Sequence, residues 1–214
     1  MATFTNQATL SYNGNTTNSN VTTGELLQVL TVTKTAITSG YYANGGVSYA
    51  VTFTNTGTTA LTALTLTDDL GGYISEGSTL YPLTYTPGTL SFFVNGTLQP
   101  TPTVNPGPPL TVTGINLPAG ASAVFVYEAT ANAYAPLAEG STITNTVTFN
   151  GAGIAEPISA SDTVSAQTVT SLTIAKAICP DVVSDNGQLT YTFIIQNSGN
   201  APADESAGVV ISDV

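Results

Sequence analysis

Lys34 and Lys176 are the only basic side chains of this 214-residue chain, which contains no arginine. Each follows a short alternation of apolar residues, in the stretches LTVTK and LTIAK. Successive side chains of a β-strand face opposite sides, so both lysines fall on the apolar side of their strand. The sequence therefore directs two ammonium groups toward a hydrophobic core, where a charge without a partner is costly.

A carboxylate and a carboxamide occupy the apolar side of further alternating stretches. Asp68 ends the run LTLTD, and Asn145 stands third in ITNTVTF. The pattern occurs a second time, because Asp213 ends VVISD and Asn6 stands third in FTNQATL. A lysine, an aspartate and an asparagine at core-facing positions, present in two copies, are therefore expected to act together.

These three residue types can form a covalent bond. Burial lowers the pKa of a lysine toward the neutral, nucleophilic amine, and it favours the protonated form of a carboxyl group. With Asp68 as the acid that promotes the reaction, Lys34 would attack the carboxamide of Asn145 and form an isopeptide bond, with loss of ammonia. The alternative is a buried salt bridge between Lys34 and Asp68, with Asn145 as a hydrogen-bond partner.

The stretches that carry these residues predict an all-β chain. Thr, Val, Ile, Tyr and Phe alternate in short runs separated by Gly, Pro and Asn, which is typical of antiparallel strands in a β-sandwich with Greek-key connections. Asn95-Gly96 between two apolar runs predicts a two-residue hairpin turn. The expected strands are Phe4–Leu10, Leu27–Thr35, Val47–Thr54, Leu61–Thr67, Leu90–Gln99, Leu110–Ile115, Ala123–Thr130, Ile143–Asn150, Ile158–Val164, Leu172–Ala177 and Leu189–Gln196.

Comparison of the chain with itself reveals a repeat of about 140 residues. FTNQATLSYNG near the start matches ITNTVTFNGAG, LTVTKTA matches LTIAKAI, GGVSYAVTFTNTG matches NGQLTYTFIIQNSG, and LTLTDD matches VVISDV. This predicts one complete repeat over residues 26–168. The closing strands of a repeat precede it in residues 1–25, and the opening strands of a second, incomplete repeat follow it in residues 169–214.

The stretches YAVTFTNTGTTALTALTLTDDL and STITNTVTFNG resemble the bacterial surface repeat known as domain of unknown function eleven. The opening ATFTNQATLSYNG also resembles the start of clostridial surface proteins of this type. The resemblance implies immunoglobulin-like sandwiches strung in tandem on Gram-positive surface or spore-appendage proteins. The chain is also similar, in residue types and their order, to immunoglobulin-like pilins and adhesins known for Lys–Asn isopeptide bonds.

Composition excludes several classes of function. A net charge of −11 disfavours nucleic acid and anionic membranes as partners, and no apolar run is long enough for membrane insertion. The chain has no histidine and a single cysteine, which excludes histidine-based triads and thiolate metal clusters. We therefore expect no cofactor, no metal and no turnover enzyme, with at most one self-limited bond-forming event.

Cys179 and the N-terminus leave two further points open. Cys179 lacks a second cysteine in the same chain, so it is either an unimportant thiol or the site of a disulfide between subunits. MATFTNQATL has neither the basic nor the apolar region of a signal peptide. We expect an extracellular, cell-surface or spore-surface location, reached after removal of a leader or by another route such as cell lysis.

The preferred functional hypothesis is a structural subunit of an extracellular or spore-surface filament. The alternative is an adhesin stalk or carbohydrate-binding module of a larger cell-surface protein. In the filament hypothesis, Phe4–Leu10 of one subunit completes the C-terminal repeat of its neighbour by strand complementation, giving a head-to-tail homopolymer. Asn6 would then lie near Lys176 and Asp213 of that neighbour, where a second isopeptide bond could form.

Overall fold

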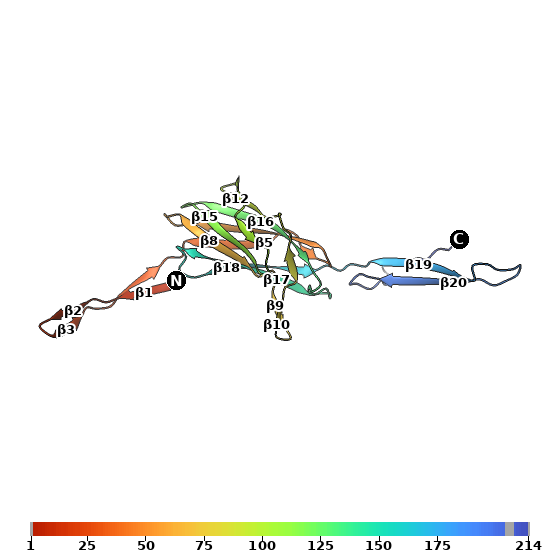
Figure 1. The fold of residues 1–214 in the computed structure, drawn as a ribbon, viewed down its shortest axis with the longest axis horizontal. Coiled ribbons are helices and arrows are strands. Elements are labelled where there is room, and N and C mark those ends of the chain that lie inside the picture. Colours follow the sequence, from red (N-terminus) through yellow and green to blue (C-terminus); the bar gives the residue numbers. More distant parts are fainter. Residues whose placement is uncertain (1, 204–207, 214) are drawn as a thin grey trace.

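The computed structural model describes residues 2–203 and 208–213, and its regular structure there consists entirely of β-strands (Figure 1). No helix within these residues is long and apolar enough to span a membrane. The prediction of an all-β sandwich is confirmed. The sandwich lies in the centre of the molecule, and two slender hairpin arms project from its opposite ends.

Two six-stranded sheets form the sandwich. The first sheet runs in the order β13-β12-β16-β7-β5, with β11 also paired to β16, and the second runs in the order β14-β15-β8-β17-β18-β6. The first sheet contains β5 (Leu30–Ala36), β7 (Gly46–Asn55), β11 (Leu83–Tyr85), β12 (Ser91–Val94), β13 (Thr97–Gln99) and β16 (Ser122–Ala131). The second contains β6 (Gly40–Tyr41), β8 (Leu61–Asp68), β14 (Thr103–Asn105), β15 (Leu110–Leu117), β17 (Thr142–Ala152) and β18 (Ile158–Ala166). A short hairpin of β9 (Tyr73–Ser75) and β10 (Ser78–Leu80) lies beside them.

The core forms because alternate residues of the long strands face the opposite sheet. Burial alternates residue by residue along β7 and β16, as a half-buried strand requires. Phe53 packs against Phe125 and Phe149 with ring centroids 5.2 and 4.8 Å apart, so aromatic side chains of both sheets meet in the middle. These contacts fix which face of each strand points inward, including the faces that carry the polar residues discussed below.

The predicted turn at Asn95-Gly96 is confirmed, because both residues have positive φ angles, 48° and 77°, and join β12 to β13. The prediction of one continuous strand over Phe4–Leu10 is wrong. The chain there forms β1 (Ala2–Asn6) and β2 (Thr9–Tyr12), separated by Gln7 and Ala8. The side chain of Ser19 accepts the Ala8 N–H at 3.0 Å and so interrupts the ladder between the two halves.

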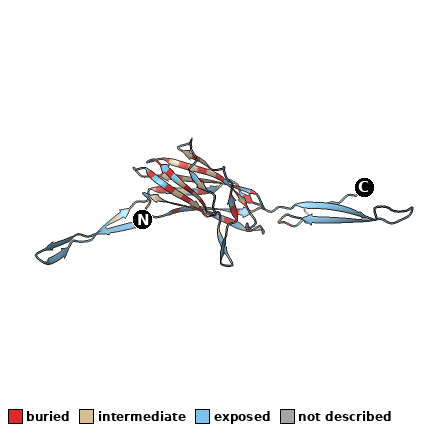
Figure 2. Ribbon diagram, in the orientation of Figure 1, coloured by how far each residue is buried: buried red, intermediate tan, exposed pale blue. Residues whose placement is uncertain are grey.

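The N-terminal arm consists of two consecutive hairpin segments. β1 pairs with β4 (Thr22–Leu26), and β2 pairs with β3 (Asn15–Asn18) toward the tip. Its described apolar side chains have no core to enter, and Figure 2 shows the arm exposed along its length. Asn6 pairs with Thr22 across this hairpin, just as Asn145 pairs with Asp162 across β17 and β18.

The C-terminal arm repeats the beginning of the sandwich. β19 (Leu172–Cys179) pairs with β20 (Thr190–Asn197) as β5 pairs with β7. The turn after β20 repeats the turn after β7, since Asn197 and Asn55 each accept a backbone N–H two residues later at 3.0 Å. Residues 209–213 are not a strand, but Asp213 forms an ion pair with Lys176 of this hairpin as Asp68 of β8 does with Lys34. Both strands of the arm are exposed throughout (Figure 2).

The linker between the sandwich and the C-terminal arm is held by Asn200. Its side-chain nitrogen donates to the carbonyl oxygens of Leu137 and Gln167, both at 2.7 Å, and its side-chain oxygen accepts the Val169 N–H at 2.6 Å. The arm is therefore anchored to the sandwich through one carboxamide.

Candidate cross-link site in the sandwich core

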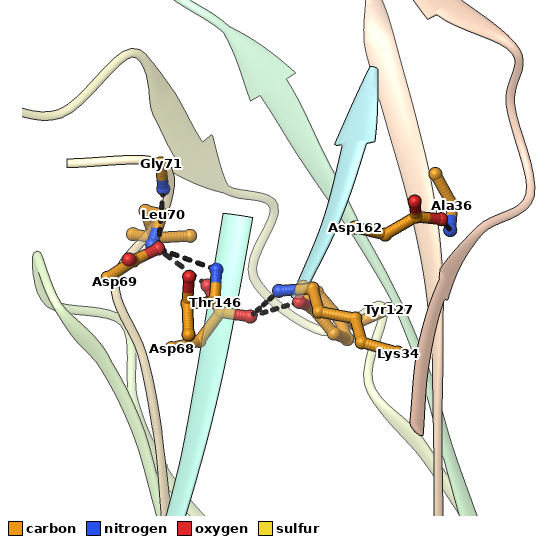
Figure 3. Close-up of polar contacts among 9 residues, drawn as sticks. All are labelled: Lys34, Ala36, Asp68, Asp69, Leu70, Gly71, Tyr127, Thr146 and Asp162. Atoms are coloured by element: carbon orange, nitrogen blue, oxygen red, sulfur yellow. Dashed lines mark hydrogen bonds and ion pairs between the residues drawn. The ribbon is translucent and has the colours of Figure 1, made fainter. Parts of the chain in front are cut away.

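Lys34 reaches across the core to Asp68. Lys34 lies on β5 of the first sheet and Asp68 on β8 of the second, and the Lys34 Nζ to Asp68 Oδ2 distance is 2.7 Å (Figure 3). Both side chains are 0% exposed. The inward orientation inferred from strand alternation is thus realised, and the ion pair of the salt-bridge alternative is present.

Asp68 accepts hydrogen bonds on both of its oxygens. Oδ1 accepts the backbone N–H of Leu70 at 2.8 Å, and Oδ2 accepts the hydroxyl of Tyr127 in addition to Lys34. Burial, followed by the charge of Asp68, raises the pKa of Tyr127, so this hydroxyl keeps its proton and remains a donor. Three donors from three different segments therefore converge on one buried carboxylate.

Burial lowers the pKa of Lys34, and the charge and hydrogen bond of Asp68 oppose this shift. The carboxylates of Asp69 and Asp162 oppose it more weakly. The ammonium also lies 4.6 Å from the centroid of the Tyr49 ring, a cation–π contact that favours the charged form. Desolvation prevails, which moves Lys34 toward the neutral amine that nucleophilic attack requires.

Asn145 lies in the same cluster without a hydrogen bond. It is fully buried on β17 beside the hydroxyls of Tyr49 and Tyr127. Among the described residues, neither its side-chain nitrogen nor its oxygen has a partner within hydrogen-bond geometry. Val147 of β17 pairs with Asp68 of β8. Asn145 lies two residues before Val147 on the same face of β17, so it is a diagonal neighbour of Asp68. An unpaired buried carboxamide costs about 1–3 kcal/mol, which a purely structural asparagine would not normally bear.

Two residues of the cluster, Tyr127 and Asp162, were not predicted from the sequence. Tyr127 stands on the core side of its strand, but in a sequence a tyrosine there is indistinguishable from ordinary packing. Asp162 pairs with Asn145 across β17 and β18, and its Oδ2 accepts the Ala36 N–H of the other sheet at 2.7 Å. The alternation of ISASDTV places Asp162 on the same side as Val164, a signal comparable to that of Asp68.

The second set of predicted residues is divided between the two arms. Lys176 forms an ion pair with Asp213, and its Nζ lies 4.3 Å from the centroid of the Tyr191 ring, as Lys34 lies over Tyr49. Asn6 lies in the arm at the other end of the molecule and is exposed (Figures 1 and 2). The structure therefore does not bring Asn6 to Lys176 within one chain. Cys179, the disulfide candidate, is free and exposed.

Solved structures show where this fold occurs. A variant of BcpA, the major pilin subunit of Bacillus cereus, superimposes with a TM-score of 0.52 over 93% of this chain and 64% of that chain, at 11% identity. The chain folds like a Gram-positive major pilin. The full-length major pilin SpaD of Corynebacterium diphtheriae matches with a TM-score of 0.46 over 69% of this chain and 36% of that one, at 14% identity. This chain thus spans less than two thirds of the length of either pilin.

The likeness to these pilins is one of fold. No protein-family model matches the chain, and no curated protein is similar to it in sequence. The relation to domain of unknown function eleven remains a resemblance.

Proposed function

We propose that this chain is a structural subunit of an extracellular or spore-surface filament that polymerises head to tail. The observation that carries the proposal is the pair of arms. One arm carries the counterpart of the β17–β18 hairpin, and the other carries the counterparts of β5 and β7 and a segment that matches β8 in sequence. The two arms project from opposite ends of the sandwich (Figure 1). Each arm holds a part of the repeat that the other lacks.

The arms have the surfaces expected of partners in strand complementation. In the N-terminal arm, Phe4 is 53% exposed and Leu10 is 65% exposed, whereas their counterparts in the sandwich, Ile143 and Phe149, are buried. A strand with an uncovered apolar face and unpaired backbone groups readily accepts another chain. Because the contact joins unlike surfaces and does not close on itself, repetition produces a filament.

Within the sandwich, we propose an isopeptide bond between Lys34 and Asn145, with Asp68 as the proton-transferring acid. The neutral amine of Lys34 attacks the side-chain carbonyl carbon of Asn145, whose amide nitrogen leaves as ammonia. Desolvation of Lys34 and the unpaired carboxamide of Asn145 support this reaction. In the disputed chain-entropy model, closing a loop of about a hundred residues stabilises a fold by roughly 4–5 kcal/mol.

Filament formation can be tested with two substitutions in the N-terminal arm. Phe4→Asp places a charge on the apolar face of β1, and Thr5→Asp places the same charge on the opposite face. Electron microscopy should show filaments for the unmodified chain and Thr5→Asp, and none for Phe4→Asp or after deletion of residues 2–26. Circular dichroism should show an intact sandwich in all four. Monodisperse monomers of the unmodified chain would instead favour the adhesin alternative.

The intramolecular bond has a separate test by intact mass. The unmodified chain should be lighter than its sequence by one ammonia for each bond formed, and Asp68→Ala and Asn145→Ala should each remove the deficit that belongs to the sandwich. Lys34 should also resist amine-modifying reagents after denaturation. A full mass together with a reactive Lys34 would leave only the salt bridge.

A further inference from the structure

The C-terminal arm presents a lysine–aspartate pair assembled like the one in the sandwich but uncovered. Lys176 pairs with Phe193 across β19 and β20 as Lys34 pairs with Val51 across β5 and β7. Phe193 is 37% exposed, whereas Val51 is fully buried. The side chains of Lys176 and Asp213 are 38% and 44% exposed, against 0% for both members of the pair in the sandwich. Within the part of the chain that the structure describes, Lys176 and Asp213 are paired with each other but remain open to solvent.

The sandwich shows what covers such a pair. Two strands flank Asp68 in the second sheet, β15 on one side and β17 on the other. β17 carries Asn145, and β18 follows on its far side. In the N-terminal arm, the hairpin of β1 and β4 has the same pairing, with Asn6 in the position of Asn145. The stretch around Asn6 also matches that around Asn145 in apolar pattern. This hairpin is therefore the segment of the chain that fits over Lys176 and Asp213.

The hairpin cannot cover the pair of its own chain. The two arms lie at opposite ends of the molecule, separated by the whole sandwich (Figure 1). The tip of the N-terminal arm points away from its own sandwich (Figure 1), which leaves it free to reach another copy. The occupant is thus the N-terminal arm of a second copy.

We infer that Asn6 of one copy forms an isopeptide bond with Lys176 of the next, with Asp213 as the acid, so that the filament is covalent. This inference rests on the proposed head-to-tail assembly. As the neutral amine, Lys176 Nζ bonds to Asn6 Cγ while the bond from Cγ to Nδ2 breaks. The proton released by Nζ passes through the Asp213 carboxyl group to Nδ2, which leaves as ammonia. Covering the pair excludes water from the reacting groups.

A complementation experiment tests the link directly. Asn6→Ala retains a reactive Lys176, and Lys176→Ala retains a reactive Asn6, so neither variant can polymerise covalently alone. When the two are mixed, only one kind of junction is competent. The mixture should give a covalent dimer and nothing larger on a reducing, denaturing gel, while the unmodified chain gives a ladder. The dimer should carry a branched peptide joining Lys176 to Asn6, with one ammonia lost at the junction.

Controls separate this link from other causes of a ladder. Asn18→Ala changes another exposed asparagine of the same arm and should keep the ladder. Cys179→Ser should also keep it, whereas a ladder that disappears with reductant would assign the link to Cys179 and overturn the inference. The sandwich should fold in every variant, because Asn6, Asn18, Lys176 and Cys179 all lie in the arms.

Loss of the covalent bond and loss of head-to-tail assembly give different results. Filaments that form in the mixture without any covalent dimer would overturn the Asn6–Lys176 bond and leave head-to-tail assembly standing. Absence of both filaments and covalent species in the unmodified chain would overturn the two together. A branched peptide that joins Lys176 to any residue other than Asn6 would also contradict the inference.

Discussion

At the scale of single residues, the stability of the core depends on the hydrogen bonds that the buried Asp68 carboxylate accepts. Asp68 accepts an ammonium, a hydroxyl and a backbone N–H. Removing one partner of a buried ion pair lowers the free energy of unfolding by about 3–5 kcal/mol, because the remaining charge is left buried and unpaired. Replacing both partners with apolar residues often leaves the stability unchanged. In the proposed reaction, the same carboxylate would transfer a proton from Lys34 to the leaving nitrogen of Asn145.

Two stacked tyrosines offer a matched test of this arrangement. The hydroxyl of Tyr127 donates a hydrogen bond to Asp68, whereas the buried hydroxyl of Tyr49 has no hydrogen-bond partner among the residues that the structure describes. Hydrogen bonds to charged groups contribute about 1.5–3 kcal/mol, so Tyr127→Phe should lower the free energy of unfolding by about that amount. Tyr49→Phe should leave it unchanged or raise it. Guanidinium denaturation of both variants provides the measurement, and equal losses would contradict the assigned roles.

Strand alternation predicted much of this site, because a period of two fixes the face on which a side chain lies. Lys34, Asp68 and Asn145 are buried as expected. The hydroxyl of Tyr127 could not be assigned to Asp68, since that contact depends on how the two sheets stack. Nor could the unpaired state of Asn145 be read from the sequence, because hydrogen bonding depends on the relative positions of strands that are far apart along the chain.

At the scale of elements, β5 and β18 meet at the open edge of the sandwich although they belong to different sheets. Asp162 of β18 joins them by accepting the Ala36 N–H of β5 at 2.7 Å. Side-chain hydrogen bonds of this kind close an edge that no backbone ladder can close, because the two strands are not neighbours in one sheet.

Substitution of Asp162 should therefore loosen this edge. Asp162→Ala is expected to reduce the free energy of unfolding by about 1–2 kcal/mol and to speed hydrogen exchange at the Ala36 amide. Asp162→Asn keeps an acceptor oxygen and should retain most of the protection. Unchanged exchange at Ala36 in the alanine variant would show that another group closes the edge.

In the arms, the sequence predicted the C-terminal hairpin better than the N-terminal one. The chain was expected to have a single closing strand over Phe4–Leu10, and the repeat pattern supported it. The strand is instead divided into β1 and β2 at Gln7 and Ala8, where the Ser19 side chain accepts the Ala8 N–H. The match between β5 and β19 was visible in the letters LTVTK and LTIAK, since pairing and burial there follow the same alternation.

At the scale of the whole molecule, the scarcity of basic residues makes trypsin a probe of assembly. Trypsin cleaves after lysine or arginine, and this chain has two lysines and no arginine. Lys34 is buried in the sandwich, whereas the Lys176 side chain is 38% exposed on an arm whose two strands are exposed throughout. Exposed segments with few tertiary contacts open most easily and are cleaved first.

We expect trypsin to cut the native monomer after Lys176 and to spare Lys34. In filaments of the Asn6→Ala variant, no covalent link to Lys176 can form. We expect Lys176 to resist cleavage by trypsin there, because the neighbouring arm alone buries it. Gel electrophoresis with mass identification of the fragments distinguishes the cases. Lys176→Gln serves as the uncut control, and cleavage at Lys34 as fast as at Lys176 would contradict the burial of the sandwich lysine.

Asn200 has a consequence for how such a filament would bend. Its three hydrogen bonds hold the joint between the sandwich and the C-terminal arm, whereas the corresponding residue of the complete repeat is Thr58, which has no carboxamide to offer. Along a head-to-tail polymer, clamped joints would alternate with unclamped ones. Bending would then occur mainly at the joint that follows each N-terminal arm, which lacks these hydrogen bonds. The filament would therefore have one flexible joint per subunit.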